Sequence, residues 1–219
     1  MIARMNDAPP IDDAPPADSA QNGDDAARAA YHHGDLRAAL VAAALEILSR
    51  DGAAYLTLRG VAAQAQVSHA APRNHFGDFA GLRAAVATEG FVRLGAALRD
   101  GMRAADDARS ARAEATLTAY VGFAAGAPAL FRLMFELGPG DDPLGTVGEA
   151  MRTALAPLFA AAKGLTLNVI GEPLEGGRSA EFHLWSMVHG HAVLATTGSY
   201  LLMHGRPAEG EVLPPDDAV

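Results

Sequence analysis

The sequence predicts an all-α protein, in which a long helix joins an N-terminal three-helix head to an α-helical body. Alanine is abundant while β-branched residues are sparse, and this balance favours helix throughout. Apolar residues recur at helical spacing along most of the chain, and stretches rich in glycine and proline separate them. Half of the 219 residues are hydrophobic, which is enough for one good-sized core or two small ones.

The composition excludes several classes of protein. The chain has no cysteine, so disulfides, thiolate metal sites and a cysteine nucleophile are ruled out. Apolar runs fall short of the roughly 18 residues of a membrane span, and the acidic, proline-rich N-terminus differs from a secretory signal. We therefore expect a cytoplasmic protein without a membrane partner. The net charge of −9 argues against an extended nucleic-acid surface, so any DNA contact must be local.

Residues 1–30 are predicted to form a disordered acidic tail, because aspartate, alanine and proline bury too little apolar surface to offset ordering entropy. A first helix follows, with Asp35 as its expected cap and Gly52 as its end. The apolar stripe of this helix consists of Leu36, Leu40, Ala43, Ala44, Ile47 and Leu48.

Residues 57–76 predict a helix, a tight turn and a second short helix. Thr57 and Ser68 are the expected caps, since a hydroxyl oxygen can accept the free backbone N–H groups of a first turn. Pro72 lies in the opening turn of the second helix, where a missing N–H group costs little. The first helix can bury a face made of Leu58, Val61, Ala62 and Ala65. A short helix with exposed polar side chains is how a helix-turn-helix reads a major groove.

At these residues the sequence resembles the TetR family of transcriptional regulators. The family pattern Leu-Arg-x-Val-Ala-x-x-Ala-x-Val-Ser occurs at 58–68, and its later His-Phe and Leu positions occur within 75–82. The opening Tyr-His-His-Gly-Asp-Leu at 31–36 strengthens the likeness, which covers about 31–95. Arg73 stands where the family usually has Tyr, and Phe79 where it usually has Lys. Both positions usually contact the DNA backbone.

The predicted DNA-binding residues are Thr57, Arg59, Ser68, His69, Ala70, Arg73, Asn74 and His75. Arg73 can meet phosphate or guanine, and Asn74 can meet adenine. Residues 31–82 hold four arginines and four acidic residues, so this segment is formally neutral. We therefore expect few ionic contacts with DNA and a shallow salt dependence.

Asp78 is the expected cap of a long helix over 79–105, which in the family connects head and body. Further helices are predicted at 110–126, 128–137, 143–163 and 178–204, with loops at 138–143 and 164–177. The predicted domains are the tail at 1–30, a DNA-binding head at 31–78, a ligand-binding and dimerisation body at 79–205, and a flexible C-terminal tail at 206–219.

The last predicted helix resembles the C-terminal domain type named for its Trp, His and Gly, here Trp185, His189 and Gly190. Trp185 and His189 are four residues apart and share one face. A mid-helix glycine costs about 1 kcal/mol relative to alanine, so Gly190 is expected to permit close approach of another helix. The predicted ligand-binding residues are Phe123, Phe131, Met134, Phe135, Phe159, Trp185 and His189. Such side chains are more often plain core, and the resemblance is what favours a pocket.

The resemblance implies a homodimeric, ligand-responsive regulator, in the first instance a repressor that a small-molecule effector releases from a near-palindromic double-stranded operator. Two heads would enter successive major grooves about 34–36 Å apart. We predict neither an enzyme nor a cofactor or metal site, because the sequence lacks a nucleophile elbow, a glycine-rich phosphate loop and metal-spaced His/Glu residues. One alternative is a helix-turn-helix used for protein contact, which the neutral head, Phe79 and the acidic tail favour. The other is an α-helical enzyme, whose scattered acid–base groups would be Glu136, Glu181, His183 and His189.

Overall fold

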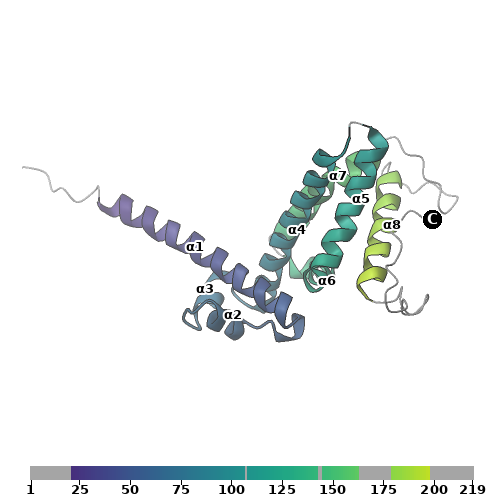
Figure 1. Cartoon of the computed structure of the whole chain (residues 1–219). Coiled ribbons are helices and arrows are strands. Elements are labelled where there is room, and N and C mark those ends of the chain that lie inside the picture. The colour runs from purple at the N-terminus through teal and green to yellow at the C-terminus, as the bar shows by residue number, and fades with distance from the viewer. Residues whose placement is uncertain (1–20, 107, 143–144, 163–178, 198–219) are drawn as a thin grey trace, which may run out of the picture. The chain divides into compact units, whose positions relative to one another are not determined.

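The computed structural model describes residues 21–106, 108–142, 145–162 and 179–197. Helices make up the ordered elements of these residues and no strand occurs among them, so the all-α prediction is confirmed (Figure 1). The helices are α1 (Gln21–Arg50), α2 (Leu58–Gln64), α3 (Ala71–Phe76), α4 (Phe79–Ala104), α5 (Arg109–Gly126), α6 (Pro128–Glu136), α7 (Thr146–Ala162) and α8 (Ser179–Thr196). Two single 3-10 turns, η1 (Ala53–Tyr55) and η2 (Pro139–Asp141), lie between them.

The chain divides into two units, residues 1–38 and 39–219, which are described separately. The predicted tail at 206–219 and the predicted loop at 164–177 lie outside the described residues, as do 1–20 and 198–204. The predicted domain boundaries stay predictions.

Helix α1 differs from its prediction at the N-terminal end. It begins at Gln21, and Asp35 therefore lies inside the helix instead of capping it. The alanines at 26, 27, 29 and 30 explain the difference, because alanine has the highest helix propensity. The prediction gave more weight to the acidic residues of this segment than to its alanines. The other end is as predicted: Gly52 has φ +88°, and its N–H donates to the Leu48 carbonyl at 3.2 Å.

A small core supports the helix-turn-helix formed by α2 and α3. On α1, the predicted stripe is buried from residue 40 onward, with Leu40 and Ala44 fully covered. On α2, Val61 and Ala62 are likewise fully buried. The Gln64 amide donates to a Glu46 carboxylate oxygen at 2.7 Å and ties α2 to α1. Each fully buried leucine contributes about 1.5–3 kcal/mol.

In the body, α4 packs against α5, α6 and α7, and α8 packs against α5 and α7 (Figure 1). Small residues set the closest approaches along α4. A Cβ at Gly95 would lie 3.0 Å from the Ala154 Cα on α7, and one at Gly101 would lie 3.0 Å from the Ala115 carbonyl oxygen on α5. The predicted ends of α4, α5 and α6 agree with the structure to within a residue or so. Within the described residues, no single helix has both the length and the apolar character to cross a membrane.

Candidate functional site

Helix α2 begins as the sequence predicts. Thr57 is its N-cap, and the Thr57 Oγ1 accepts a hydrogen bond from the Gly60 N–H at 2.9 Å. The helix ends at a turn in which Gln66 has φ +57°, the left-handed region that a non-glycine residue enters at a cost. The Val67 N–H donates to the Ala62 carbonyl at 3.0 Å across this turn. These bonds fix the angle at which the chain enters the second helix.

The start of α3 corrects one prediction. Ser68 does not cap this helix through its hydroxyl, because α3 begins three residues later, at Ala71, and its N-cap is Ala70 without a side-chain bond. Ser68 instead uses its backbone carbonyl, which accepts from the Ala71 N–H at 3.0 Å. At the opening of a tight turn the backbone oxygen, and not the hydroxyl, is aligned with the following N–H group. Pro72 occupies the first turn of α3, as predicted.

The predicted DNA-binding residues form an exposed surface around α3. Ala71 and Pro72 are buried and seat the helix, so that Arg73 and Asn74 face outward. The exposed members of the predicted set are Thr57, Arg59, Ser68, His69, Ala70, Arg73 and Asn74, while His75 is half-buried. The cap bond uses the Thr57 oxygen as an acceptor, so the hydroxyl hydrogen of this residue can still be donated to a DNA phosphate.

Two arginines of this surface are available to bind phosphate. Arg59 and Arg73 are exposed and make no ion pair within the described part of the chain. Arg50, in contrast, bonds both carboxylate oxygens of Asp51 at 2.8–3.0 Å. This side-chain hydrogen bond raises the pKa of Arg50 and lowers the pKa of Asp51. The charge of Arg50 is therefore already compensated.

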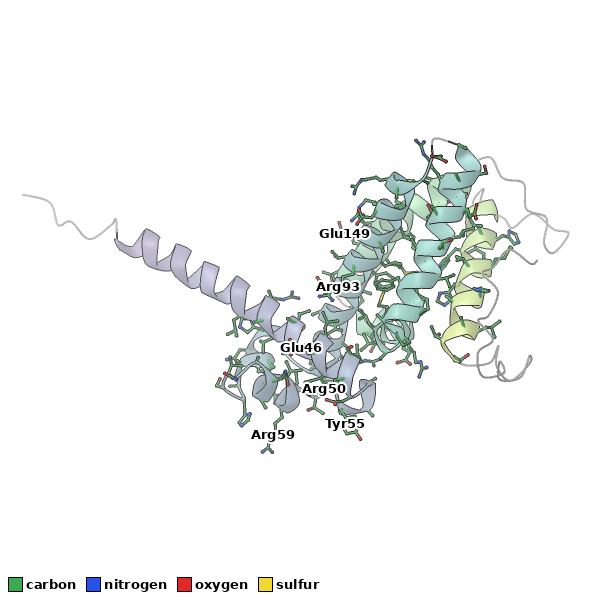
Figure 2. All side chains as sticks on the ribbon, in the orientation of Figure 1. Glu46, Arg50, Tyr55, Arg59, Arg93 and Glu149 are labelled. Atoms are coloured by element: carbon green, nitrogen blue, oxygen red, sulfur yellow. The ribbon has the colours of Figure 1, made fainter. Side chains whose placement is uncertain are left out.

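Tyr55 is a surface residue that the sequence pattern did not predict. Its side chain is 67% exposed in η1, just before the Thr57 cap. Figure 2 shows Tyr55 and Arg59 extending from the same side of this part of the chain. A tyrosine hydroxyl can donate to a phosphate oxygen. Phe79, at the position where the family usually has Lys, is 40% exposed.

The junction between α3 and α4 is closely packed. Gly77 has φ +77°, and its N–H donates to the Arg73 carbonyl at 2.8 Å. Asp78 caps α4 as predicted, with its Oδ1 accepting from the Gly81 N–H at 2.9 Å. A Cβ placed on Gly81 would overlap the carbonyl oxygen of Phe76, so the end of α3 rests directly on the first turn of α4.

In the body, four of the predicted ligand-binding residues come together as one aromatic cluster. His189 lies against Phe135 (ring centroids 4.4 Å apart), Phe131 (5.3 Å) and Trp185 (6.0 Å). Met134 is buried where α6 meets Gly90 of α4. Phe123 and Phe159 are half-buried and make no ring contact with this cluster among the described residues.

Tyr120 on α5 also belongs to this cluster, and the sequence pattern did not predict it. Its side chain is fully buried. Its hydroxyl lies 2.9 Å from the His189 Nδ1 and accepts a bond from the Trp185 Nε1–H at 3.3 Å. Burial raises the pKa of Tyr120 and lowers the pKa of His189, so both groups are favoured in their neutral forms. Which of the two groups donates to the other depends on which nitrogen of the neutral imidazole carries the proton.

A separate groove of about 500 Å³ lies between α5 and α8. Its lining residues are Leu117, Thr118, Val121, Gly122, Leu184, Met187, Val188 and His191. None of the predicted ligand-binding residues is among them, so the choice of those seven stays a prediction. Within the described residues, His, Asp and Glu side chains nowhere gather in a group of three that could hold a metal ion.

Residues 113–211 match the profile of the tetracyclin repressor-like C-terminal domain. No curated protein matches the chain. A solved structure of a protein of unknown function from Rhodococcus sp. RHA1 is 36% identical, with a TM-score of 0.63, and the match covers 81% of this chain and 89% of that one.

Two further solved structures match the chain at lower identity. One belongs to SCO4313, described as a regulatory protein (20% identity, TM-score 0.59, 80% of this chain and 91% of that chain). The other belongs to the multidrug binding protein EbrR in complex with imidazole (20% identity, TM-score 0.47, 78% of this chain and 86% of that chain). The domain match over the C-terminal half, together with the helix-turn-helix ahead of it and the 36% identical relative of the same fold, shows that the chain belongs to the TetR family.

Proposed function

We propose that this TetR-family protein is a homodimeric transcriptional regulator, which binds double-stranded DNA through α2 and α3 and leaves its operator when a small molecule binds the body. The observation that carries the proposal is the exposed surface of α3. Arg73 and Asn74 point outward from a helix whose other side is seated by Ala71 and Pro72. Arginine and asparagine are suited to bidentate contacts with guanine and adenine in the major groove.

Helix α8 supports the homodimer. It is apolar on more sides than its own chain covers: Phe182, Met187, Val193 and Leu194 are each between 37% and 53% exposed. A helix that is apolar all round is normally buried. A Cβ at Gly190 would meet nothing within 4 Å, so the close approach predicted there is not made by the described part of this chain. We propose that a second copy makes it.

Side-chain contacts couple the helices of the body to α4, and α4 in turn supports the DNA-binding surface. The Arg83 guanidinium on α4 pairs with Glu136 at the end of α6 at 3.5 Å. On the same two helices, the Phe91 and Phe135 rings meet edge to face, with centroids 5.3 Å apart. Phe135 in turn contacts His189 on α8. A ligand that binds one arrangement of α6 better than another would shift α4, and with it the α3 that rests on α4.

The proposed DNA binding is tested with a gel-shift assay of the full chain on the intergenic DNA upstream of the protein's own gene. We expect the wild-type protein to shift this fragment, and the Arg73→Ala, Asn74→Ala double variant to lose the shift. Arg103→Ala is the matched control, because Arg103 is an exposed arginine of α4 that pairs only with Asp100. Retention of the shift by the double variant would show that α3 is not the reading helix.

The same assay separates the proposal from its main alternative. A helix-turn-helix used for protein contact would show no DNA affinity even at low salt, where phosphate contacts are strongest.

Sedimentation equilibrium tests the dimer: we expect wild type to be dimeric and Gly190→Arg to be monomeric. Gly140→Arg, at another glycine with open space around it, should stay dimeric.

A further inference from the structure

A groove of about 400 Å³ runs between α4 and α7, apart from the aromatic cluster around His189. Its volume is within the usual range for small-molecule sites, about 300–1,000 Å³. Five residues of each helix line it: Thr88, Phe91, Val92, Gly95 and Arg99 on α4, and Thr146, Glu149, Ala150, Thr153 and Ala154 on α7. On each helix they recur at helical spacing, so the groove is formed by one face of α4 and one face of α7.

Arg99 is the unusual residue of this groove. Helix α4 contains four arginines, and three of them have a carboxylate partner: Arg83 with Glu136, Arg93 with Glu89, and Arg103 with Asp100. Arg99 is half-buried and makes no ion pair or hydrogen bond with any described residue. A partly desolvated guanidinium without a partner is unfavourable, and an anion bound beside it would relieve this cost.

The Arg99 guanidinium lies over Gly95. The Arg99 Nη1 lies 3.1 Å from where a Cβ on Gly95 would be, and the Ala154 Cα lies 3.0 Å from the same point. The absence of a side chain at Gly95 therefore lets the guanidinium fold back into the groove beside Ala154. Two threonine hydroxyls of the groove are engaged elsewhere, since Thr88 bonds the Ala84 carbonyl and Thr146 lies within reach of Asp142.

The rest of the groove is apolar apart from Glu149 and the exposed Thr153. Ala150 and the 54% exposed Val92 form a surface suited to a hydrocarbon group, above the fully buried Phe91. Glu149, labelled in Figure 2, is exposed and lies five residues before Ala154 on α7, about 7–8 Å along the helix axis. It does not pair with Arg99. Its charge disfavours a second negative group, so the groove favours a ligand with a single anionic end.

We propose that this groove binds a small amphipathic monoanion, such as a medium-chain carboxylate, with its anionic group on Arg99 and its hydrocarbon part on Val92 and Ala150. The inference rests on the proposed function and deepens it by naming the chemical class of the effector. Because the groove involves α4, whose first turn supports α3, its occupant acts on the helix that positions the DNA-binding surface.

The test is isothermal titration calorimetry of the full chain, without DNA, using three probes of equal length: octanoate, 1-octanol and octylamine. A charge-assisted hydrogen bond to a partly buried arginine should make octanoate bind at least about tenfold more tightly than octanol, with octylamine weakest. Arg99→Met should abolish the preference for octanoate while octanol binding remains. Arg103→Met, which removes a paired arginine outside the groove, should leave the preference unchanged.

A second variant makes the test independent of any structural effect of losing Arg99. Ala150→Phe fills the groove, and we expect it to weaken binding of both octanoate and octanol. Equal affinities of the wild type for octanoate and octanol, an unchanged preference in Arg99→Met, or full octanoate binding by Ala150→Phe would each overturn the proposal. Since the titration contains no DNA, its failure leaves the gel-shift result standing, and a missing gel shift leaves the titration standing.

Discussion

The contact between α3 and α4 offers the sharpest test of how the DNA-binding surface is held. Gly81 lies in the first turn of α4, and a Cβ there would overlap the carbonyl oxygen of Phe76, the last residue of α3. The obstacle is backbone, so no side-chain rotation can relieve it. The substitution Gly81→Ala must therefore push α3 and α4 apart.

The magnitude follows from two opposing terms. Replacing a helical glycine by alanine gains up to about 1 kcal/mol of helix propensity. Overpacking at a closed contact costs about 1–3 kcal/mol, and occasionally more. Because the clash is with a carbonyl oxygen that closes α3, we take the upper part of this range and expect Gly81→Ala to lower the free energy of unfolding by about 1–2 kcal/mol. A displaced α3 should also weaken operator binding roughly tenfold, which corresponds to about 1.4 kcal/mol.

Gly122→Ala is the matched control. Gly122 is also inside a helix, α5, but a Cβ there meets nothing within 4 Å. Propensity alone should then raise the free energy of unfolding by about 0.5–1 kcal/mol. Urea denaturation of both variants gives the two free energies, and the gel-shift assay gives the operator affinity. If Gly81→Ala is as stabilising as Gly122→Ala and binds the operator normally, the close contact between α3 and α4 does not exist.

Three further predictions follow from single groups. Burial lowers the pKa of His189, so the unfolded chain binds a proton more tightly than the folded chain; the free energy of unfolding should be intact above a pH of about 6.5 and fall below it. Urea denaturation near pH 7.5 and near pH 5.5 should show this loss in wild type and in His191→Gln, but less of it in His189→Gln. Gln66 has φ +57°, so Gln66→Val should be less stable than Gln66→Gly by about 1–2 kcal/mol in thermal or urea unfolding, and equal stability would contradict the strained turn. The Asp142 carboxylate accepts from the N–H groups of Val147 and Gly148 at 3.1 and 2.9 Å, so Asp142→Ala should cost about 1 kcal/mol near pH 7. Partial burial tends to raise the pKa of Asp142, but these hydrogen bonds outweigh it and lower the pKa. The loss of free energy of unfolding in Asp142→Ala should therefore shrink as the pH falls below about 4. A loss that does not depend on pH would contradict the capping role.

The local features of the fold were predictable because short-range chemistry decides them. The caps at Thr57 and Asp78 and the helix end at Gly52 depend on bonds between residues three or four positions apart. The same holds for the helix-turn-helix, whose residues are contiguous. Where local signals competed, prediction was wrong. Asp35 looked like a cap, yet the alanines before it carry α1 back to Gln21, and Ser68 looked like a cap although α3 begins at Ala71.

By itself, the sequence determined the helices, the helix-turn-helix and the polar residues that α3 exposes, because periodicity and capping act within one or two turns. Only the tertiary structure decided which side chains from distant helices meet. Tyr120 bonds His189 and Trp185 across 69 and 65 residues, and no spacing rule links α5 to α8. Likewise, Arg99 is one of four arginines on α4. Arg93 and Arg103 pair with carboxylates three or four residues away on the same helix, but only the packing of α7 against α4 places Arg99 beside a groove. Such contacts depend on how whole helix faces pack together, which the spacing of residues within each helix does not encode.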